Sequence, residues 1–233
     1  MRTLLPLIIL TSVLFTGIAP AGAQAPGPTP TPVSGSGDSL LVAMRSAMRA
    51  SGTVHAVLDA SGSVPNRIDF STEVIADVSF RDGALHTATS SVRTNLARHT
   101  RTSERSELKV TGGKGAWRVP HAQWQCEKLL PSDVSGELLA FQAQPASAKI
   151  AGTGTLNGIA IWKVKGKAAI TPWTGSRMLD TVTFDIAQTT GLPLQISTHF
   201  TTHWDQWPAK ETLVERYSNP GASLTISLPA KCR

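Results

Sequence analysis

One segment of the chain alternates apolar and polar residues almost without error: Arg67-Ile-Asp-Phe-Ser-Thr-Glu-Val-Ile-Ala-Asp-Val-Ser-Phe-Arg81. Successive side chains of a strand point to opposite faces, so this pattern predicts one long strand with an apolar face and a polar face. Similar patterns return across most of the later chain. They predict a large antiparallel sheet with one apolar face, and the functional question becomes what covers that face.

Turn signals place further strands around this one. Asp82-Gly83 and Asn157-Gly158 are two-residue hairpin signals, and Gly112-Gly113-Lys114-Gly115 and Thr190-Gly191 also predict turns. The strand after Asn157-Gly158 is expected to set apolar residues against three lysines on its other face. Later strands are expected over residues 182–186, 192–204 and, at the end of the chain, 222–228.

This count of about ten strands exceeds what an open twisted sheet holds without curling. We therefore expect a β-rich α+β fold, an unclosed antiparallel β-barrel with two helices plugging its concave apolar face. The first helix is expected over Leu40 to Met48, capped by Asp38 or Ser39 and ended by Gly52. A second helix is expected from Pro131 through Phe141. A two-sheet sandwich fits the alternation nearly as well.

The N-terminus carries the features of a secretory signal. Arg2 precedes the apolar residues 4–18, and Ala21-Gly22-Ala23 is a cleavage site of the A-x-A type. The apolar run is shorter than the roughly 20 residues of a membrane-spanning helix. We therefore expect a signal peptide over residues 1–23, cleaved after Ala23, and export to the periplasm, the cell envelope or the outside. Residues 24–37, rich in Pro, Gly and Ser, predict a linker, and residues 38–233 predict a single domain.

The two cysteines, Cys126 and Cys232, are expected to form a disulfide, because exported proteins oxidise such pairs. Two buried free thiols are the alternative. The bridge would fix the end of the chain to the segment around Trp124.

The formal net charge is +6, and the basic residues concentrate between Arg93 and Arg118. Seven basic residues stand there against two glutamates. Such a segment suits an anionic membrane surface or an acidic envelope component, and an ordinary solvated strand pair is the alternative. Nucleic acid is not an expected partner, because the chain is exported and carries no recognition motif. The basic surface is expected to comprise Arg93, Arg98, Arg101, Arg105 and Lys109.

No motif of a known catalytic type accounts for the chain, and we expect neither an enzyme nor a cofactor. Ser106 and Lys109 have the Ser-x-x-Lys spacing, but a strand does not bring the two groups together as a helix would. His199 and His203 would share one face of a strand roughly 13 Å apart, too far for one metal ion. A metal site is therefore not expected.

The order of elements resembles the outer-membrane lipoprotein carrier (LolA-like) superfamily, and more closely its exported relatives of the LppX/LprG type. The resemblance rests on the leading amphipathic helix, the long early hairpins and three segments: Gly158-Ile-Ala-Ile-Trp-Lys-Val164, Thr190-Gly-Leu-Pro-Leu194 and Leu224-Thr-Ile-Ser-Leu-Pro229. It implies an unclosed antiparallel barrel wrapped around helices, with an apolar cavity for acyl chains. The chain differs from the lipid-anchored relatives because it has no lipobox cysteine.

The resemblance implies non-catalytic binding or carriage of a lipid or a lipid-modified molecule. The apolar residues that would line the cavity are Leu40, Met44, Met48, Phe70, Val74, Val78, Phe80, Trp162, Val164, Phe184, Ile196, Phe200 and Trp204. A closed core built from the same residues is the alternative. In that case the protein would be an envelope sensor or interaction module that binds another protein through its basic segment.

Overall fold

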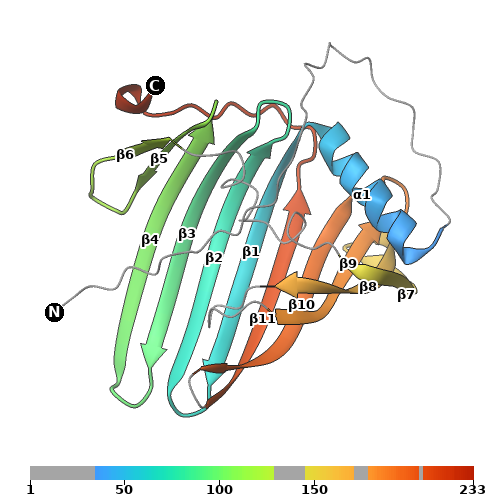
Figure 1. Ribbon diagram of the computed structural model, residues 1–233, viewed down its shortest axis with the longest axis horizontal. Helices are drawn as coiled ribbons and strands as arrows, with labels where there is room; N and C mark the ends of the chain where they lie inside the picture. Colours follow the sequence, from blue (N-terminus) through green and yellow to red (C-terminus); the bar gives the residue numbers. More distant parts are fainter. Residues whose placement is uncertain (1–34, 129–144, 171–177, 205–206) are drawn as a thin grey trace.

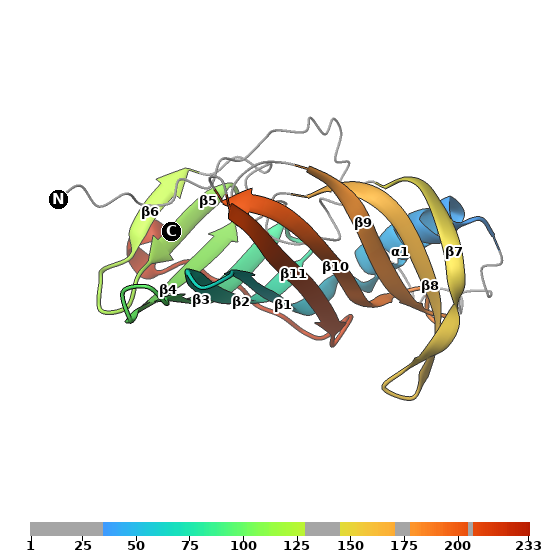
Figure 2. The same cartoon turned by 90° about the horizontal axis from the view of Figure 1, so that it is seen from below.

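The structure is a computed structural model that describes residues 35–128, 145–170, 178–204 and 207–233. In these residues a single antiparallel sheet of eleven strands curves without closing, and one α-helix lies against it (Figures 1 and 2). A short 3-10 helix, Ala230–Cys232, ends the chain. The elements are α1 Gly37–Ser51, β1 Thr53–Val64, β2 Ile68–Ser79, β3 Ala84–Asn95, β4 Thr100–Thr111, β5 Lys114–Arg118, β6 Gln125–Lys128, β7 Ala146–Leu156, β8 Ile159–Ile170, β9 Met178–Ala187, β10 Pro193–Trp204 and β11 Trp207–Ser218.

The sheet consists of two meanders that meet at its centre. Strands β1 to β6 pair in chain order, and so do β7 to β11. The pairing of β1 with β11 joins the two meanders, so β6 and β7 are the edge strands. The predicted hairpin turn at Asn157-Gly158 has positive φ angles of 50° and 80°, as a type I′ turn requires.

The alternation of residues 67–81 is confirmed by β2. Phe70, Val74 and Val78 are buried on one face of this strand, while Glu73 is exposed on the other. The face of the sheet on which α1 lies, in contact with β1, β7 and β8, is called the inner face. The opposite face is called the outer face.

Helix α1 begins one turn earlier than the sequence suggested. Its N-cap is Ser36, whose side chain accepts a hydrogen bond from the Ser39 amide at 3.3 Å, so the expected cap at Asp38 or Ser39 is wrong. The Asp38 carboxylate instead accepts a hydrogen bond from the Ala148 amide of β7 at 2.8 Å. Gly52 ends the helix with φ of 79°, as predicted. Asp38, which was expected to cap the helix, therefore makes a tertiary contact with β7 instead.

The expected strand over residues 222–228 is wrong. These residues form no strand, and the segment runs across the ends of β1 to β4 toward the C-terminus (Figure 1). Thr53 holds its start, because the hydroxyl of Thr53 donates to the Ala222 carbonyl at 2.7 Å. The true last strand, β11, was not predicted. The expected second helix, residues 131–141, lies outside the described residues.

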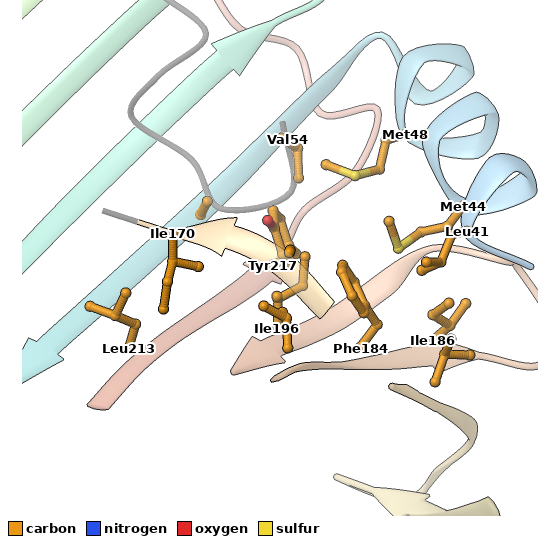
Figure 3. Packing of buried hydrophobic residues seen from close by; sticks show 14 of the residues in the cluster. Leu41, Met44, Met48, Val54, Ile170, Phe184, Ile186, Ile196, Leu213 and Tyr217 are labelled. Atoms are coloured by element: carbon orange, nitrogen blue, oxygen red, sulfur yellow. The ribbon is translucent and has the colours of Figure 1, made fainter. Parts of the chain in front are cut away.

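The main core lies between α1 and the inner face (Figure 3). Met44 and Phe184 are its largest fully buried side chains, with 0 % of their surface exposed. A smaller cluster at the other end of the sheet contains Ala116, Leu228 and Cys232, with Trp124 packed against it. Among the described residues, no helix has the length and apolar character needed to cross a membrane.

Candidate functional site

The inner face collects most of the residues that were expected to line a cavity. The side chains of Leu40, Met44, Met48, Val78, Val164, Phe184, Ile196 and Phe200 are buried in the main core, and Phe80 and Trp162 pack against it. Phe70 and Val74 are buried on the same face of β2. Trp204 ends β10, but its side chain lies outside the described part of the chain. The inner face is thus largely apolar, and part of it lies under α1.

A small cavity remains beside α1. It measures about 60 Å³ and lies between Ala43 and Ala47 of the helix, Trp162 of β8 and the turn that contains Gly191. Ligand sites are commonly about 300–1,000 Å³ in volume, so this cavity is too small for an acyl chain with α1 in its present place. A lipid on the inner face would have to displace helical side chains.

Two carboxylates interrupt the apolar inner face. Glu211 and Glu215 alternate with Leu213 on the inner side of β11, with only 2 % and 0 % of their surface exposed. Their cross-strand neighbours are Phe200 and Ile196, both core residues. These glutamates were not predicted from the sequence, since acidic side chains at inward positions interrupt the apolar alternation that indicates a strand. The sequence does carry one indication of this strand: the two glutamates alternate with Leu213 and Tyr217 at every second position.

The expected basic surface divides between two faces and a turn. Arg93 pairs with Phe70 across strands and so lies on the inner-face side of β3. Arg98 lies in the turn between β3 and β4, where its amide donates to Asn95. Arg101, Arg105 and Lys109 share the outer face of β4. The five residues therefore do not form one continuous patch.

The outer face carries a polar network that crosses the five strands β1 to β5. His55 Nδ1 lies 2.7 Å from Asp77, whose other oxygen is 3.6 Å from His86 Nδ1. His86 Nε2 lies 3.0 Å from Glu107, and Glu107 accepts two hydrogen bonds from Arg118 at 2.6 and 2.8 Å. Charge-assisted pairs of this kind are shorter and stronger than neutral ones. The network therefore fixes the side chains of Glu107 and Arg118.

Next to this network, two cationic side chains lie over the ring of Trp124. The guanidinium of Arg118 lies 4.5 Å from the centre of the Trp124 ring, and the ammonium of Lys109 lies 5.4 Å from it. Both distances are within the range of cation–π attraction. The ring also packs against the small cluster that contains Cys232. Trp124 thus connects the outer-face network to the end of the chain.

Glu107 has a shifted pKa as a consequence of its surroundings. Burial alone would raise the pKa, but hydrogen bonds from Arg118 and His86 outweigh burial, and the pKa of Glu107 lies below its ordinary value. A depressed carboxylate pKa stabilises the fold above the ordinary value, and that contribution is lost as the pH falls through the folded-state pKa. Half-buried Arg45 on α1 also has a lowered pKa, because of burial and then the repulsion of Arg49.

Replacing Glu107 with glutamine is expected to reduce stability at pH 7, because the charged partner of Arg118 and His86 is removed. The wild type should lose this advantage below the ordinary glutamate pKa of roughly 4.3, so the two unfolding curves should converge in acid. Urea unfolding between pH 7 and pH 3 measures the difference. Glu73→Gln, an exposed neighbour on β2, is the control and should follow the wild type. A constant difference at every pH would contradict the assigned role.

The disulfide is present between Cys126 of β6 and Cys232 of the terminal 3-10 helix, with their Cα atoms 5.3 Å apart. This confirms the expected pairing. The partner of Cys126 is a terminal segment rather than the last strand, so the bridge fixes the chain end to the edge of the sheet.

A groove of about 560 Å³ lies on the outer face, and we call it the outer groove. Its floor is formed by β2, β3 and β4, and Arg118 of β5 with the loop that follows it forms one wall. Glu107 and Arg118 of the network are both among the residues that line the groove. The lining includes Ile75, Ala88, Arg105, Val119 and Pro120, together with the carboxylate of Glu73.

The two histidines of β10 are far from this groove. His199 Nδ1 lies 3.0 Å from the hydroxyl of Thr212 on β11, and His199 and His203 are both exposed. Within the described ranges, no three His, Cys, Asp or Glu residues are grouped so that they could hold a metal ion.

Comparison with known proteins identifies the fold. No family model matches the chain, and no curated protein matches it. The crystal structure of LprF from Mycobacterium bovis matches with a TM-score of 0.50 and 19 % identity, over 84 % of this chain and 100 % of that one. The sheet and helix are therefore arranged as in LprF. The fold expected from the resemblance, LolA-like and of the LppX/LprG type, is confirmed.

Two weaker similarities were also found. A chain of the MucA/MucB complex of Pseudomonas aeruginosa matches with a TM-score of 0.36 and 16 % identity, over 84 % of this chain and 62 % of that one. A LolA superfamily protein from Nitrosomonas europaea matches with a TM-score of 0.28 and 11 % identity, over 82 % and 96 % of the two chains.

Proposed function

We propose that the protein binds a lipid or an acylated molecule outside the cytoplasm, without catalysis, on the inner face of its sheet. The observation that carries this proposal is a largely apolar inner face on which, in the described chain, a single amphipathic helix packs against β1, β7 and β8. The fold shared with LprF supports it, since the resemblance to the carrier superfamily implies acyl-chain binding. The mature protein would begin at Gln24, be tethered by residues 24–37 and comprise one domain from residue 38, with an anionic membrane as the source of its ligand.

A lipid with two acyl chains can replace the side chains of α1 on the inner face with a favourable change in free energy. Four side chains of α1, Leu40, Leu41, Met44 and Met48, are buried against the sheet. Burial of each contributes about 1.5–3 kcal/mol, so exposing all four costs about 6–12 kcal/mol. Each buried methylene of a ligand contributes about 0.8 kcal/mol, and roughly fifteen methylenes offset the larger figure. A diacyl lipid exceeds this, and the flexible thioethers of the two methionines adapt readily to acyl chains.

The space beside α1 offers a direct test. Ala47 lines the small cavity, whereas Val42 on the same helix is 61 % exposed. We expect wild-type protein purified from its own host to carry a lipid adduct in native mass spectrometry. Ala47→Trp should fill the entry beside the helix and reduce the lipid-bound fraction at least severalfold. The control Val42→Trp adds the same side chain on the exposed face and should leave that fraction unchanged.

Circular dichroism and thermal unfolding establish that both variants are folded. Repeated preparations of the wild type without any adduct, before and after incubation with phospholipid vesicles, would contradict lipid binding. An equal lipid-bound fraction in both tryptophan variants would place the ligand away from α1.

A further inference from the structure

The outer groove combines exposed apolar side chains with an arginine that has no acidic partner among the described residues. Ile75 and Val119 are 38 % and 44 % exposed, and both line the groove. Arg105 is exposed on the same lining, and no described carboxylate forms an ion pair with it. Exposed apolar side chains beside a charged rim are the usual composition of a recognition surface.

One wall of the groove is held rigidly. Arg118 is fixed by two hydrogen bonds to Glu107 and lies over the Trp124 ring. Val119 and Pro120 follow it directly, and Cys126 of the adjoining strand is joined to Cys232. A site that is ordered before binding loses less entropy when a ligand enters. The groove is therefore a preformed feature of the fold.

The shape and the lining of the groove fit some classes of ligand better than others. A membrane surface is broad and does not enter a groove between strands. An acyl chain needs apolar walls, whereas charged side chains stand on the wall and floor of this groove, namely Arg118 and Glu107 beside Glu73. Small-molecule sites bury about 70–90 % of their ligand, but Ile75, Arg105 and Val119 are all exposed. An extended polypeptide, which continues past both ends of a groove, fits these features.

We propose that the outer groove binds an extended polypeptide segment in which an aliphatic side chain lies beside a carboxylate side chain. The aliphatic group packs between Ile75 and Val119, and the carboxylate pairs with Arg105. Arg101, four residues away on the same face of β4, adds to the local positive potential. This site lies on the opposite side of the sheet from the lipid site and does not depend on it.

The test is selection of a phage-displayed random heptapeptide library on the exported, disulfide-bonded protein. We expect enriched peptides to carry Asp or Glu within two positions of Leu, Ile or Val. Synthetic versions should bind Arg105→Glu and Ile75→Asp roughly tenfold or more weakly than the wild type, as for anchors at an interface. The matched controls are Lys165→Glu on β8 and Leu179→Asp on β9, both exposed, and they should bind like the wild type.

Each alternative result has a definite meaning. Failure to enrich any sequence class, or binding that is equal in the groove variants and the controls, overturns the proposal. Loss of binding to phosphatidylglycerol vesicles in Arg105→Glu, with no peptide selected, would assign the groove to a membrane and also overturns it. Native mass spectrometry of Arg105→Glu should give the wild-type lipid adduct, so failure at this groove is distinguishable from failure of the lipid proposal.

Discussion

Replacing Cys126 and Cys232 together with serine is expected to lower the free energy of unfolding by about 2–5 kcal/mol. The bridge closes a loop with a sequence separation of 106 residues, and such long loops gain most from a cross-link in the chain-entropy model. The small cluster around Cys232 shares no residue with the main core, so other contacts do not replace the bridge. Equilibrium unfolding in urea measures the loss.

The wild type in reducing buffer is the control for this variant and should unfold like the double serine variant. The oxidised wild type in the same buffer without reductant provides the reference. A midpoint that does not move in either case would show that the chain end is already held by its packing. Fraying of the C-terminus alone, seen as faster amide exchange after residue 221 at unchanged global stability, would also contradict the expected magnitude.

Replacing Phe184 with alanine is expected to destabilise the protein by about 3–5 kcal/mol, the usual cost of removing a buried aromatic ring. Phe184 is fully buried beneath α1 and pairs with Val164 and Ile196 on the flanking strands. The cavity that its removal leaves lies in the middle of the main core (Figure 3), where neighbours from three strands and a helix cannot all move inward. Urea unfolding with a constant m-value measures the effect.

Leu179→Ala on the same strand is the matched control, since Leu179 is 70 % exposed and its loss should change stability by no more than about 0.5 kcal/mol. If Phe184→Ala costs as little as the control, the inner face is loosely packed. Added phospholipid would then be expected to restore more stability in Phe184→Ala than in the wild type, because a ligand that fills the cavity stabilises the folded state.

The fold was largely predictable because its strands follow a local rule. Most inner positions of β2, β8 and β9 carry apolar side chains with a period of two, and glycine turns such as Asn157-Gly158 mark where the chain reverses. These signals depend only on neighbouring residues. They were sufficient for a curved, unclosed antiparallel sheet and for the helix that covers it.

The predictions of secondary structure were wrong where tertiary contacts determine whether a segment becomes a strand. β11 was missed because Glu211 and Glu215 occupy inward positions that the alternation rule reserves for apolar residues. Residues 222–228 alternate like a strand, yet they form none, because the sheet positions on both sides of β11 are already taken by β1 and β10. The outer groove could not be predicted, since it depends on which side chains of β2, β3, β4 and β5 become neighbours.

The central pairing of β1 with β11 also constrains how the chain reaches this structure. Every other strand pair joins neighbours along the sequence, but this pair brings His55 opposite Ser218 and Ser63 opposite Lys210. Two locally connected halves can each form early, whereas their junction needs the closure of a very long loop, which is slow. Until that step each half exposes an unpaired strand, and such edges invite association with other chains. The protein thus has its greatest risk of aggregation just before the two halves meet.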